Sequence, residues 1–275
     1  MFRLKEIVAR ALEEDIGTGD ITTESLADPE RQASAEIIAK EPGVIAGLDV
    51  ARLVFTTLDA AVEFTPTLAD GDRAAAGQVV ARVKGTARTI LTGERVALNF
   101  LQRLSGIATA TAAAVELLQY YPAKVMDTRK TTPGLRMLEK YAVRVAGGFN
   151  HRFGLYDSVL IKENHIKLAG SIKDAVAGVR RHVSPTSKIE VEVEALAQIP
   201  DALEAHVDII MLDNFAAEDM RKAVQMIDGR AKVEASGGIT QERLTEVAKA
   251  GVDYISMGSL THSVKALDLS LELDT

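Results

Sequence analysis

Beyond residue 120, short β-rich segments alternate with stretches long enough for one helix, and this alternation limits the possible folds more than any other feature of the sequence. The β-rich segments begin near Lys124, Ser158, Lys188, Asp208, Lys232 and Tyr254. Helical spacing of apolar residues predicts helices over 174–181, 195–205, 217–227 and 241–250. Strands separated by helices form right-handed βαβ units, so the pattern predicts a parallel sheet.

The number of predicted strands leaves two architectures open. Six strands are fewer than the usual eight of a barrel, so a closed or nearly closed (β/α) barrel competes with an open doubly wound sheet. Polar residues follow nearly every predicted strand. Because barrel enzymes place their chemistry at the carboxyl ends of the strands, we expect the barrel.

The first half of the chain has a different pattern. Apolar residues at helical spacing predict a helix over 3–12, and the acidic stretch 13–20 predicts a turn-rich loop. Short β-type runs, separated by turn residues, follow at 35–39, 44–46, 62–65 and 79–83, with a helix over 52–58 between them. Ala- and Leu-rich composition predicts a connecting helix over 93–119. We therefore expect an α+β domain in this half.

Composition excludes several classes of protein. The 275 residues are 47% hydrophobic and 26% charged, as in ordinary globular chains. A formal net charge of −7 argues against a general binder of nucleic acids or anionic membranes. The chain has no cysteine, which excludes disulfides, thiolate metal sites and a cysteine nucleophile. No run approaches the about 20 apolar residues of a membrane span, and the N-terminus lacks a signal-peptide pattern, so we expect a cytoplasmic protein.

Basic residues gather around the first two predicted strands. Between Asp127 and Lys167 the chain has eight Lys or Arg and four Asp or Glu, a balance of +4 against −11 for the rest. A concave basic site would bind and orient a polyanionic small molecule, and Arg129, Lys130 and Lys162 follow β-type runs where such a site is expected. Three residues at helical spacing are more typical of a solvated face: Arg136, Lys140 and Arg144.

Carboxylates follow the third and fourth predicted strands. Glu190, Glu192 and Glu194 alternate with valines, so they face one side of a strand, and the next strand ends at Asp213-Asn214. Buried carboxylates need cations or hydroxyl donors, which basic side chains, ribose hydroxyls or Mg²⁺ could supply. For Glu190 and Glu194, a structural ion-pair network is an equally good interpretation.

Small residues follow the last two predicted strands, in Ser236-Gly237-Gly238 and Met257-Gly258-Ser259. Glycine permits close approach to the backbone, and helix N-termini present free N–H groups to anions. Phosphate sites in barrels favour the loops after the last two strands. The residues alone therefore predict a barrel that binds a phosphorylated sugar and an anionic second substrate, without identifying a reaction.

Longer motifs occur in order along nearly the whole chain. They include residues 14–23, Glu94-Arg95-Val96-Ala97-Leu98-Asn99-Phe100, Leu104-Ser105-Gly106-Ile107-Ala108-Thr109, Asp127-Thr128-Arg129-Lys130-Thr131, Asn150-His151-Arg152 and Leu160-Ile161-Lys162. On these motifs the chain closely resembles the quinolinate phosphoribosyltransferase family, also called carboxylating nicotinate-nucleotide pyrophosphorylases. One departure is Phe149, where the family usually has a third glycine. A positive φ at this position would strain the phenylalanine backbone.

The resemblance implies a fold and an assembly. It implies an N-terminal α+β open-faced sandwich domain over 1–110, completed by the C-terminal tail 265–275, and an incomplete α/β barrel over 111–264. It also implies a homodimer or hexamer with shared active sites, in which Arg95 enters the active site of the partner subunit.

The resemblance also implies a reaction. Quinolinate and phosphoribosyl pyrophosphate would react with Mg²⁺ present, and without an organic cofactor, to give nicotinate mononucleotide, pyrophosphate and CO₂ in NAD biosynthesis. Catalytic roles fall to Lys130, Glu192 and Asp213, and the last two would also hold the metal. The residues implied to bind substrates are Arg95, Thr128, Arg129, His151, Arg152, Lys162, Ser236, Gly237, Gly238, Gly258 and His262.

Two other interpretations compete with this one. A paralogous group linked to molybdenum transport has the same fold but lacks the Asn150-His151-Arg152 and Leu160-Ile161-Lys162 combination. A lipoyl or biotinyl carrier module would need an exposed lysine in a hairpin turn, and Lys84 beside Gly85 is the candidate.

Overall fold

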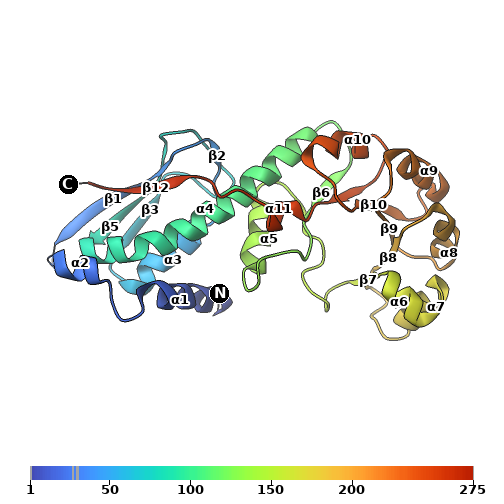
Figure 1. The fold of residues 1–275 in the computed structure, drawn as a ribbon, viewed down its shortest axis with the longest axis horizontal. Coiled ribbons are helices and arrows are strands. Elements are labelled where there is room, and N and C mark those ends of the chain that lie inside the picture. Colours follow the sequence, from blue (N-terminus) through green and yellow to red (C-terminus); the bar gives the residue numbers. More distant parts are fainter. Residues whose placement is uncertain (1, 27, 29–30, 275) are drawn as a thin grey trace. The chain divides into compact units, whose positions relative to one another are not determined.

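The computed structural model describes residues 2–26, 28 and 31–274, which form two compact units (Figure 1). The first unit contains the described residues up to 112 together with 132–147 and 263–274, and the second contains 113–131 and 148–262. The segment 132–147, assigned to the barrel from the sequence, therefore packs in the first unit. Met1 and Thr275, the outer ends of the predicted first domain and tail, lie outside the described residues.

A four-stranded antiparallel sheet of order β12-β1-β5-β3 forms the centre of the first unit. Its strands are β1 (Gln32–Ala39), β3 (Glu63–Pro66), β5 (Val79–Thr86) and β12 (Leu269–Asp274). Alternation along β1 buries Ala35, Ile37 and Ala39 in the core. Strand β12 pairs antiparallel with β1, so the chain returns to this sheet at its C-terminal end. A separate ladder joins β2 (Gly43–Val44) to β4 (Arg73–Ala74).

The helices of the first unit pack against this core. They are α1 (Phe2–Ile16), α2 (Ile21–Leu26), α3 (Leu48–Leu58), α4 (Ala87–Leu117), which continues into the second unit, and α5 (Arg136–Val145). Helix α1 includes residues 13–16, so the loop predicted there is wrong. Glutamate is a good helix former and Ile16 packs against the core, and the chain turns only at Gly17, where φ is 53°.

A buried carboxylate explains why the segment 132–147 belongs to the first unit. Glu139 on α5 is fully buried and accepts a hydrogen bond from Arg103 Nε of α4 at 2.8 Å. Its other oxygen accepts the backbone N–H of Thr132 at 3.1 Å. Leu138 and Ala142 join the hydrophobic core of the same unit. A sequence pattern cannot specify such a long-range pair, which is why the single boundary at 110 missed it.

The structure corrects one prediction about lysines and excludes one alternative. Lys140 is 2% exposed because α5 is packed into the core, so the prediction of a solvated face is wrong for this residue, although Arg144 is exposed. Lys84 lies inside β5, opposite Ser34 of β1 and Glu63 of β3. A lysine within a central strand is not the hairpin-turn lysine of a carrier module, which excludes that alternative.

The second unit contains a six-stranded parallel sheet of order β6-β11-β10-β9-β8-β7. The sheet curves, and helices lie along its outer side (Figure 1). The incomplete (β/α) barrel is therefore confirmed over the open doubly wound sheet. Its strands are β6 (Lys124–Met126), β7 (Val159–Ile161), β8 (Ile189–Val193), β9 (Ile209–Asp213), β10 (Lys232–Ser236) and β11 (Tyr254–Ser256).

Helical segments connect these strands. They are α6 (Glu163–Ala169), α7 (Ile172–Arg180), η1 (Leu196–Gln198), α8 (Ile199–Glu204), α9 (Ala217–Ile227), η2 (Gln241–Arg243), α10 (Leu244–Ala248) and α11 (Ser259–His262). Two of the predicted helices thus begin with a 3₁₀ turn. Among the helices of the described residues, none is both long and apolar enough to cross a membrane.

Gly106 on α4 generates a stability prediction, because the C-terminal segment passes directly over it. A Cβ at this position would lie 2.2 Å from the carbonyl oxygen of Lys265. We predict that Gly106→Ala lowers the free energy of unfolding by about 1–3 kcal/mol, measured by denaturant titration. Gly178→Ala on α7 is the matched control, since a Cβ there would lie 3.9 Å from Arg181 Nη2. The control should stabilise by up to about 1 kcal/mol, and equal effects of the two substitutions would show that the close approach at Gly106 does not matter.

Candidate functional site

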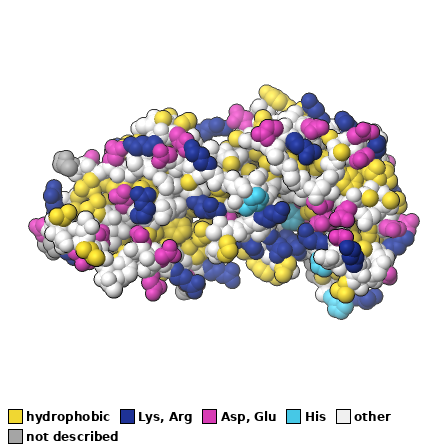
Figure 2. Space-filling model, viewed as in Figure 1, with side chains coloured by type: hydrophobic (Ala, Val, Ile, Leu, Met, Phe, Trp, Pro, Cys, Tyr) yellow, Lys and Arg dark blue, Asp and Glu magenta, His cyan; other side chains and the backbone are white. Residues whose placement is uncertain are grey.

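The functional candidates of the second unit gather at the carboxyl end of the parallel sheet. In the strand register, Glu192 and Glu234 lie on either side of Met211, and Ser236 lies beside Asp213. Side chains in one register row, and alternate side chains along one strand, face the same side of a sheet. The following residues therefore share the inner face of the curved sheet: Glu190, Glu192, Asp213, Glu234 and Ser236. Figure 2 shows Lys and Arg side chains, with His side chains among them, on the face of the molecule in view.

An ion pair joins the ends of β7 and β8. Lys162 Nζ donates to Glu192 Oε2 at 2.8 Å, and the Glu192 side chain is only 11% exposed. A carboxylate with so little access to water needs a nearby cation, which Lys162 provides. Glu194 does not extend this row. It lies beyond the end of β8, is exposed, and its backbone N–H donates to Gln198 Oε1 at 2.7 Å.

The loop after β10 lies directly against the loop after β9. The backbone N–H of Asn214 donates to the carbonyl of Ser236 at 2.9 Å, and Asn214 Nδ2 donates to Asp213 Oδ2 at 2.8 Å. Gly237 has a φ of 94°, and a Cβ there would lie 2.3 Å from Asn214 Oδ1. Both the backbone conformation and the available space therefore require glycine at this position. Gly238 also has a positive φ, of 55°, but a Cβ added there would have no contact atom within 4 Å.

The loop after β6 meets the loop after β11. Thr261 Oγ1 donates to the carbonyl of Lys130 at 2.7 Å, and the backbone N–H of Lys130 donates to Thr128 Oγ1 at 3.0 Å. A Cβ on Gly258 would lie 2.9 Å from Lys130 Cδ and 3.1 Å from His262 Nε2. Lys130, Gly258 and His262 are thus adjacent. A cation and an imidazole packed against a glycine backbone suit an anionic group.

Buried Asp127 holds the segment that leads to Arg152. Its carboxylate is fully buried and accepts the backbone N–H of His151 at 2.9 Å and Asn150 Nδ2 at 2.5 Å. Phe149, one residue before Asn150, forms a parallel bridge with Met126 at the end of β6. The φ of Phe149 is not positive, so the strain considered for a phenylalanine in place of glycine does not arise.

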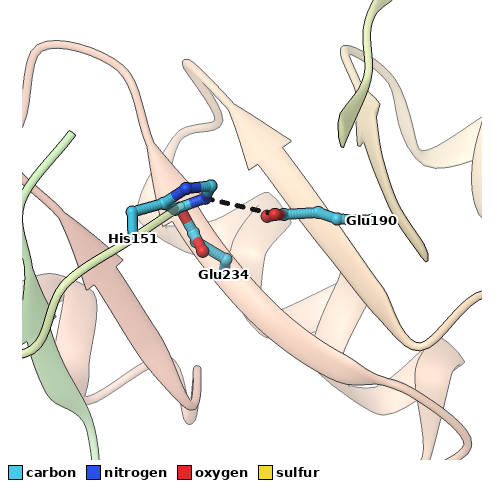
Figure 3. Close-up of side chains that lie close together, drawn as sticks. All are labelled: His151, Glu190 and Glu234. Carbon is cyan, nitrogen blue, oxygen red and sulfur yellow. Dashed lines mark ion pairs between the residues drawn. The ribbon is translucent and has the colours of Figure 1, made fainter. Parts of the chain in front are cut away.

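His151 lies between two buried carboxylates (Figure 3). Its Nε2 is 3.1 Å from Glu190 Oε2 and 3.6 Å from Glu234 Oε1. Its Nδ1 accepts the backbone N–H of Arg152 at 2.8 Å. Both ring nitrogens are therefore engaged within the protein, and a hydrogen bond from His151 to a substrate would require one of these contacts to break. Burial, followed by the charge of Glu190, raises the pKa of Glu234 well above its usual value.

Two guanidinium groups lie close to this cluster. Arg152 Nη1 donates to the carbonyl of Ser158 at 3.3 Å. Burial, followed by the positive charge of Arg129, lowers the pKa of Arg152, whereas the charges of Glu190 and Asp157 act in the opposite direction. Neighbouring like charges repel, so a ligand with two carboxylates would stabilise this arrangement.

The remaining predicted residue lies in the first unit. Arg95 is exposed on α4. All the other predicted site residues lie in the second unit, at or after the carboxyl ends of its strands or in the segment that follows the bridge at Phe149.

Sequence reasoning missed Glu234 and gave Asp127 no role. A signal for Glu234 was present, because this acid sits between Val233 and Ala235 in the middle of an otherwise apolar run. An ionisable residue there is costly to bury and is therefore a candidate functional group. Only the register of β10 against β9 reveals that it faces the inner side of the sheet.

The fold and site define an α/β-barrel protein that gathers basic side chains, carboxylates and glycine turns at the carboxyl ends of its parallel strands. Two family models match the chain: quinolinate phosphoribosyl transferase, N-terminal domain, over residues 20–105, and quinolinate phosphoribosyl transferase, C-terminal domain, over residues 107–272. The chain belongs to the quinolinate phosphoribosyl transferase family.

Individual relatives match over nearly the full chain. A probable nicotinate-nucleotide pyrophosphorylase [carboxylating] of Bacillus subtilis is 48% identical, with coverage of 98% of this chain and 93% of the relative. The crystal structure of NadC from Streptococcus pyogenes is 47% identical with a TM-score of 0.96, covering 99% and 97% of the two chains. The nicotinate-nucleotide pyrophosphorylase structure from Francisella tularensis is 43% identical with a TM-score of 0.95, covering 99% and 96%.

Asp127 generates a prediction about local order. Asp127→Asn replaces one acceptor oxygen by an amide group that cannot accept, so the hydrogen bonds to Asn150 and His151 cannot both persist. We predict that the His151 amide proton then exchanges with solvent at least about tenfold faster, measured by NMR.

Asp157→Asn is the matched control for this prediction. The Asp157 carboxylate also accepts two backbone N–H groups, from Phe153 and Gly154, but this residue is exposed. Exchange at His151 should not change in the control variant. Unchanged exchange in Asp127→Asn would show that Asp127 does not hold the segment.

Proposed function

We propose that this chain transfers the phosphoribosyl group of phosphoribosyl pyrophosphate to quinolinate and releases CO₂. The products are nicotinate mononucleotide and pyrophosphate, which gives the reaction a place in NAD biosynthesis. The observation that carries the proposal is the carboxyl end of one parallel sheet, which combines neighbouring guanidinium groups, lysines that follow β6 and β7, inward carboxylates and glycine loops. The names of the relatives at 43–48% identity support the same activity.

Quinolinate is a pyridine with two adjacent carboxylates, and the basic residues suit it. Arg129 and Arg152 lie close enough to influence one another, and each can form bidentate bonds to a carboxylate. Lys162 already binds one carboxylate, that of Glu192. We assign these residues to the dianion and His151 to the support of Arg152, through the bond from the Arg152 N–H to Nδ1.

Phosphoribosyl pyrophosphate needs anion sites at both ends of the ribose. We assign the pyrophosphate to Lys130, which Thr128 and Thr261 hold in place. The 5′-phosphate is assigned to the loops after β10 and β11, where Gly238 has open space beside its backbone and glycine permits close approach. The residues proposed for that phosphate are Ser236, Gly237, Gly238, Gly258 and His262.

Glu192 and Asp213 are proposed to hold the ribose hydroxyls and Mg²⁺. Both side chains face the inner side of neighbouring strands, and carboxylate oxygens suit Mg²⁺, which takes one or two carboxylates plus substrate phosphates and water. The donor chemistry of the site therefore fits the ion. When bound, the ion would neutralise charge on the departing pyrophosphate.

The chemistry then rests on positioning and electrostatics. The pyridine nitrogen forms a bond to C1 of the ribose as the bond from C1 to pyrophosphate breaks. The nearby carboxylates favour the positive charge that develops on the sugar. The ring nitrogen then carries a positive charge, which stabilises the electron pair left on C2 when its carboxylate departs as CO₂. A proton replaces CO₂ at C2.

We further propose a homodimer or hexamer with shared sites, in which Arg95 reaches the active site of the partner subunit. This proposal is supported by the exposure of Arg95 on α4 and by the family resemblance. A cytoplasmic location stays a prediction from the sequence.

Substitution of the basic residues tests the proposed function. Lys130→Ala and Arg152→Ala should each lower kcat/KM for the phosphoribosyl transfer by about a hundredfold or more while leaving the melting temperature nearly unchanged, because each removes a charge-assisted contact to substrate. Lys222→Ala on α9 is the control, since Lys222 forms ion pairs with Glu218 and Asp219 of its own helix, on the outer side of the barrel. A wild-type kcat/KM in either site variant would remove that residue from the site.

A mixing experiment tests the shared site. Arg95→Ala and Lys162→Ala should each be inactive, yet equal amounts dissociated and reassembled together should recover roughly a quarter of wild-type activity. In a two-fold dimer, half the assemblies are hybrids and each hybrid has one intact site. Recovery no greater than that of either variant alone would argue against a contribution of Arg95 across an interface.

A further inference from the structure

Glu190 and Glu234 form a buried carboxyl pair that the proposed reaction does not use. They lie on β8 and β10, on either side of β9, and their side chains are 4% and 0% exposed. Among the described residues, Glu190 Oε1 and both oxygens of Glu234 accept no hydrogen bond. Candidate ligand atoms of these two residues and His151 lie within 4.8 Å of one another. Two adjacent buried negative charges are prohibitively costly, so the pair needs a proton or a cation.

The tautomer of His151 decides whether a proton or a cation compensates the two carboxyl groups. Nδ1 accepts the backbone N–H of Arg152 at 2.8 Å and so carries no hydrogen. A neutral imidazole then has its hydrogen on Nε2, which points at Glu190 Oε2, 3.1 Å away. A nitrogen that carries hydrogen cannot bind a metal ion. The geometry therefore favours a shared proton over a cation at this cluster.

The surroundings of the two carboxyl groups differ. Glu190 accepts the Nε2–H of His151 and also lies within the electrostatic influence of Arg152. Glu234 is fully buried, and its Oε1 is 3.6 Å from His151 Nε2, which is too far for a hydrogen bond. Burial, followed by the charge of Glu190, raises the pKa of Glu234, whereas the Ser256 side chain acts in the opposite direction. Because Glu234 is fully buried and His151 Nε2 is too far away to donate to it, Glu234 is the group that needs a proton of its own.

We propose that Glu234 is a neutral carboxylic acid that keeps its proton and donates a hydrogen bond to Glu190, and that this pair fixes His151 as the Nε2–H tautomer that orients Arg152. Glu234 acts through Glu190 and His151, so it is a positioning residue. His151 in turn holds the backbone N–H of Arg152, the residue proposed to bind a carboxylate of quinolinate. This last step rests on the proposed function, whereas the protonation and tautomer do not.

Spectroscopy without substrate tests the protonation. The infrared spectrum at neutral pH should contain a protonated carboxyl band that is absent from Glu234→Gln. Long-range proton–nitrogen NMR should show His151, assigned by its absence in His151→Ala, as a neutral ring with hydrogen on Nε2. Loss of only a carboxylate band, or a His151 ring protonated on both nitrogens, would overturn the proposal. So would stoichiometric binding of Zn²⁺ or Mn²⁺ to the purified protein that Glu234→Gln abolishes.

Kinetics test the positioning role. Glu234→Leu should raise the KM for quinolinate by about tenfold, leave the KM for phosphoribosyl pyrophosphate within about twofold, and not lower the melting temperature, because an apolar side chain replaces a buried polar group. Glu234→Gln has the shape of the neutral acid and can donate an N–H to Glu190, so it should restore the wild-type KM.

The outcomes separate this inference from the proposed function. An unchanged KM for quinolinate in Glu234→Leu, or an equal loss in Glu234→Gln, would overturn the positioning role. A wild-type protein without transferase activity would overturn the proposed function, while the infrared and NMR results would still decide the protonation of Glu234.

Discussion

The cost of burying charge inside a parallel sheet governs the second unit. Carboxylates at the inner face of β8, β9 and β10 are tolerated only where a cation, a hydrogen-bond donor or a proton compensates them. Lys162 compensates Glu192 at 2.8 Å, and the N–H groups of Asn150 and His151 compensate Asp127. Glu190 and Glu234 are compensated by one ring N–H and one proton. The result is a sheet end where basic groups are held in place by the carboxylates that they compensate.

Close steric contacts fix the backbone around the site. The loops after β9 and β10 touch so closely that Gly237 cannot carry a side chain, and Gly258 leaves room for Lys130 beside His262. These contacts place the groups proposed to bind anions on turns that follow strand ends. A rigid scaffold of this kind supplies position, which is most of what a transfer with an activated leaving group demands.

The parallel sheet and the location of the site could be predicted from the sequence, because both depend on local patterns. The alternation of β-rich and helical segments predicts the parallel sheet, and residues after each strand predict where chemistry gathers. Contacts between distant residues could not be predicted this way. The burial of Lys140 and the assignment of 132–147 to the first unit accompany long-range contacts such as the pairing of Arg103 with Glu139 and the core packing of α5. The role inferred for Glu234 depends on the strand register and on the atom of His151 that accepts the Arg152 N–H.

The most direct test of the proposed reaction follows the carboxylates of quinolinate. Purified protein is incubated with phosphoribosyl pyrophosphate, Mg²⁺ and quinolinate that carries ¹³C in its 2-carboxylate. We expect one labelled CO₂ for each nicotinate mononucleotide formed, and no labelled CO₂ when the label is in the 3-carboxylate instead. Absence of the mononucleotide, or its formation with both carboxylates retained, would contradict the proposed reaction.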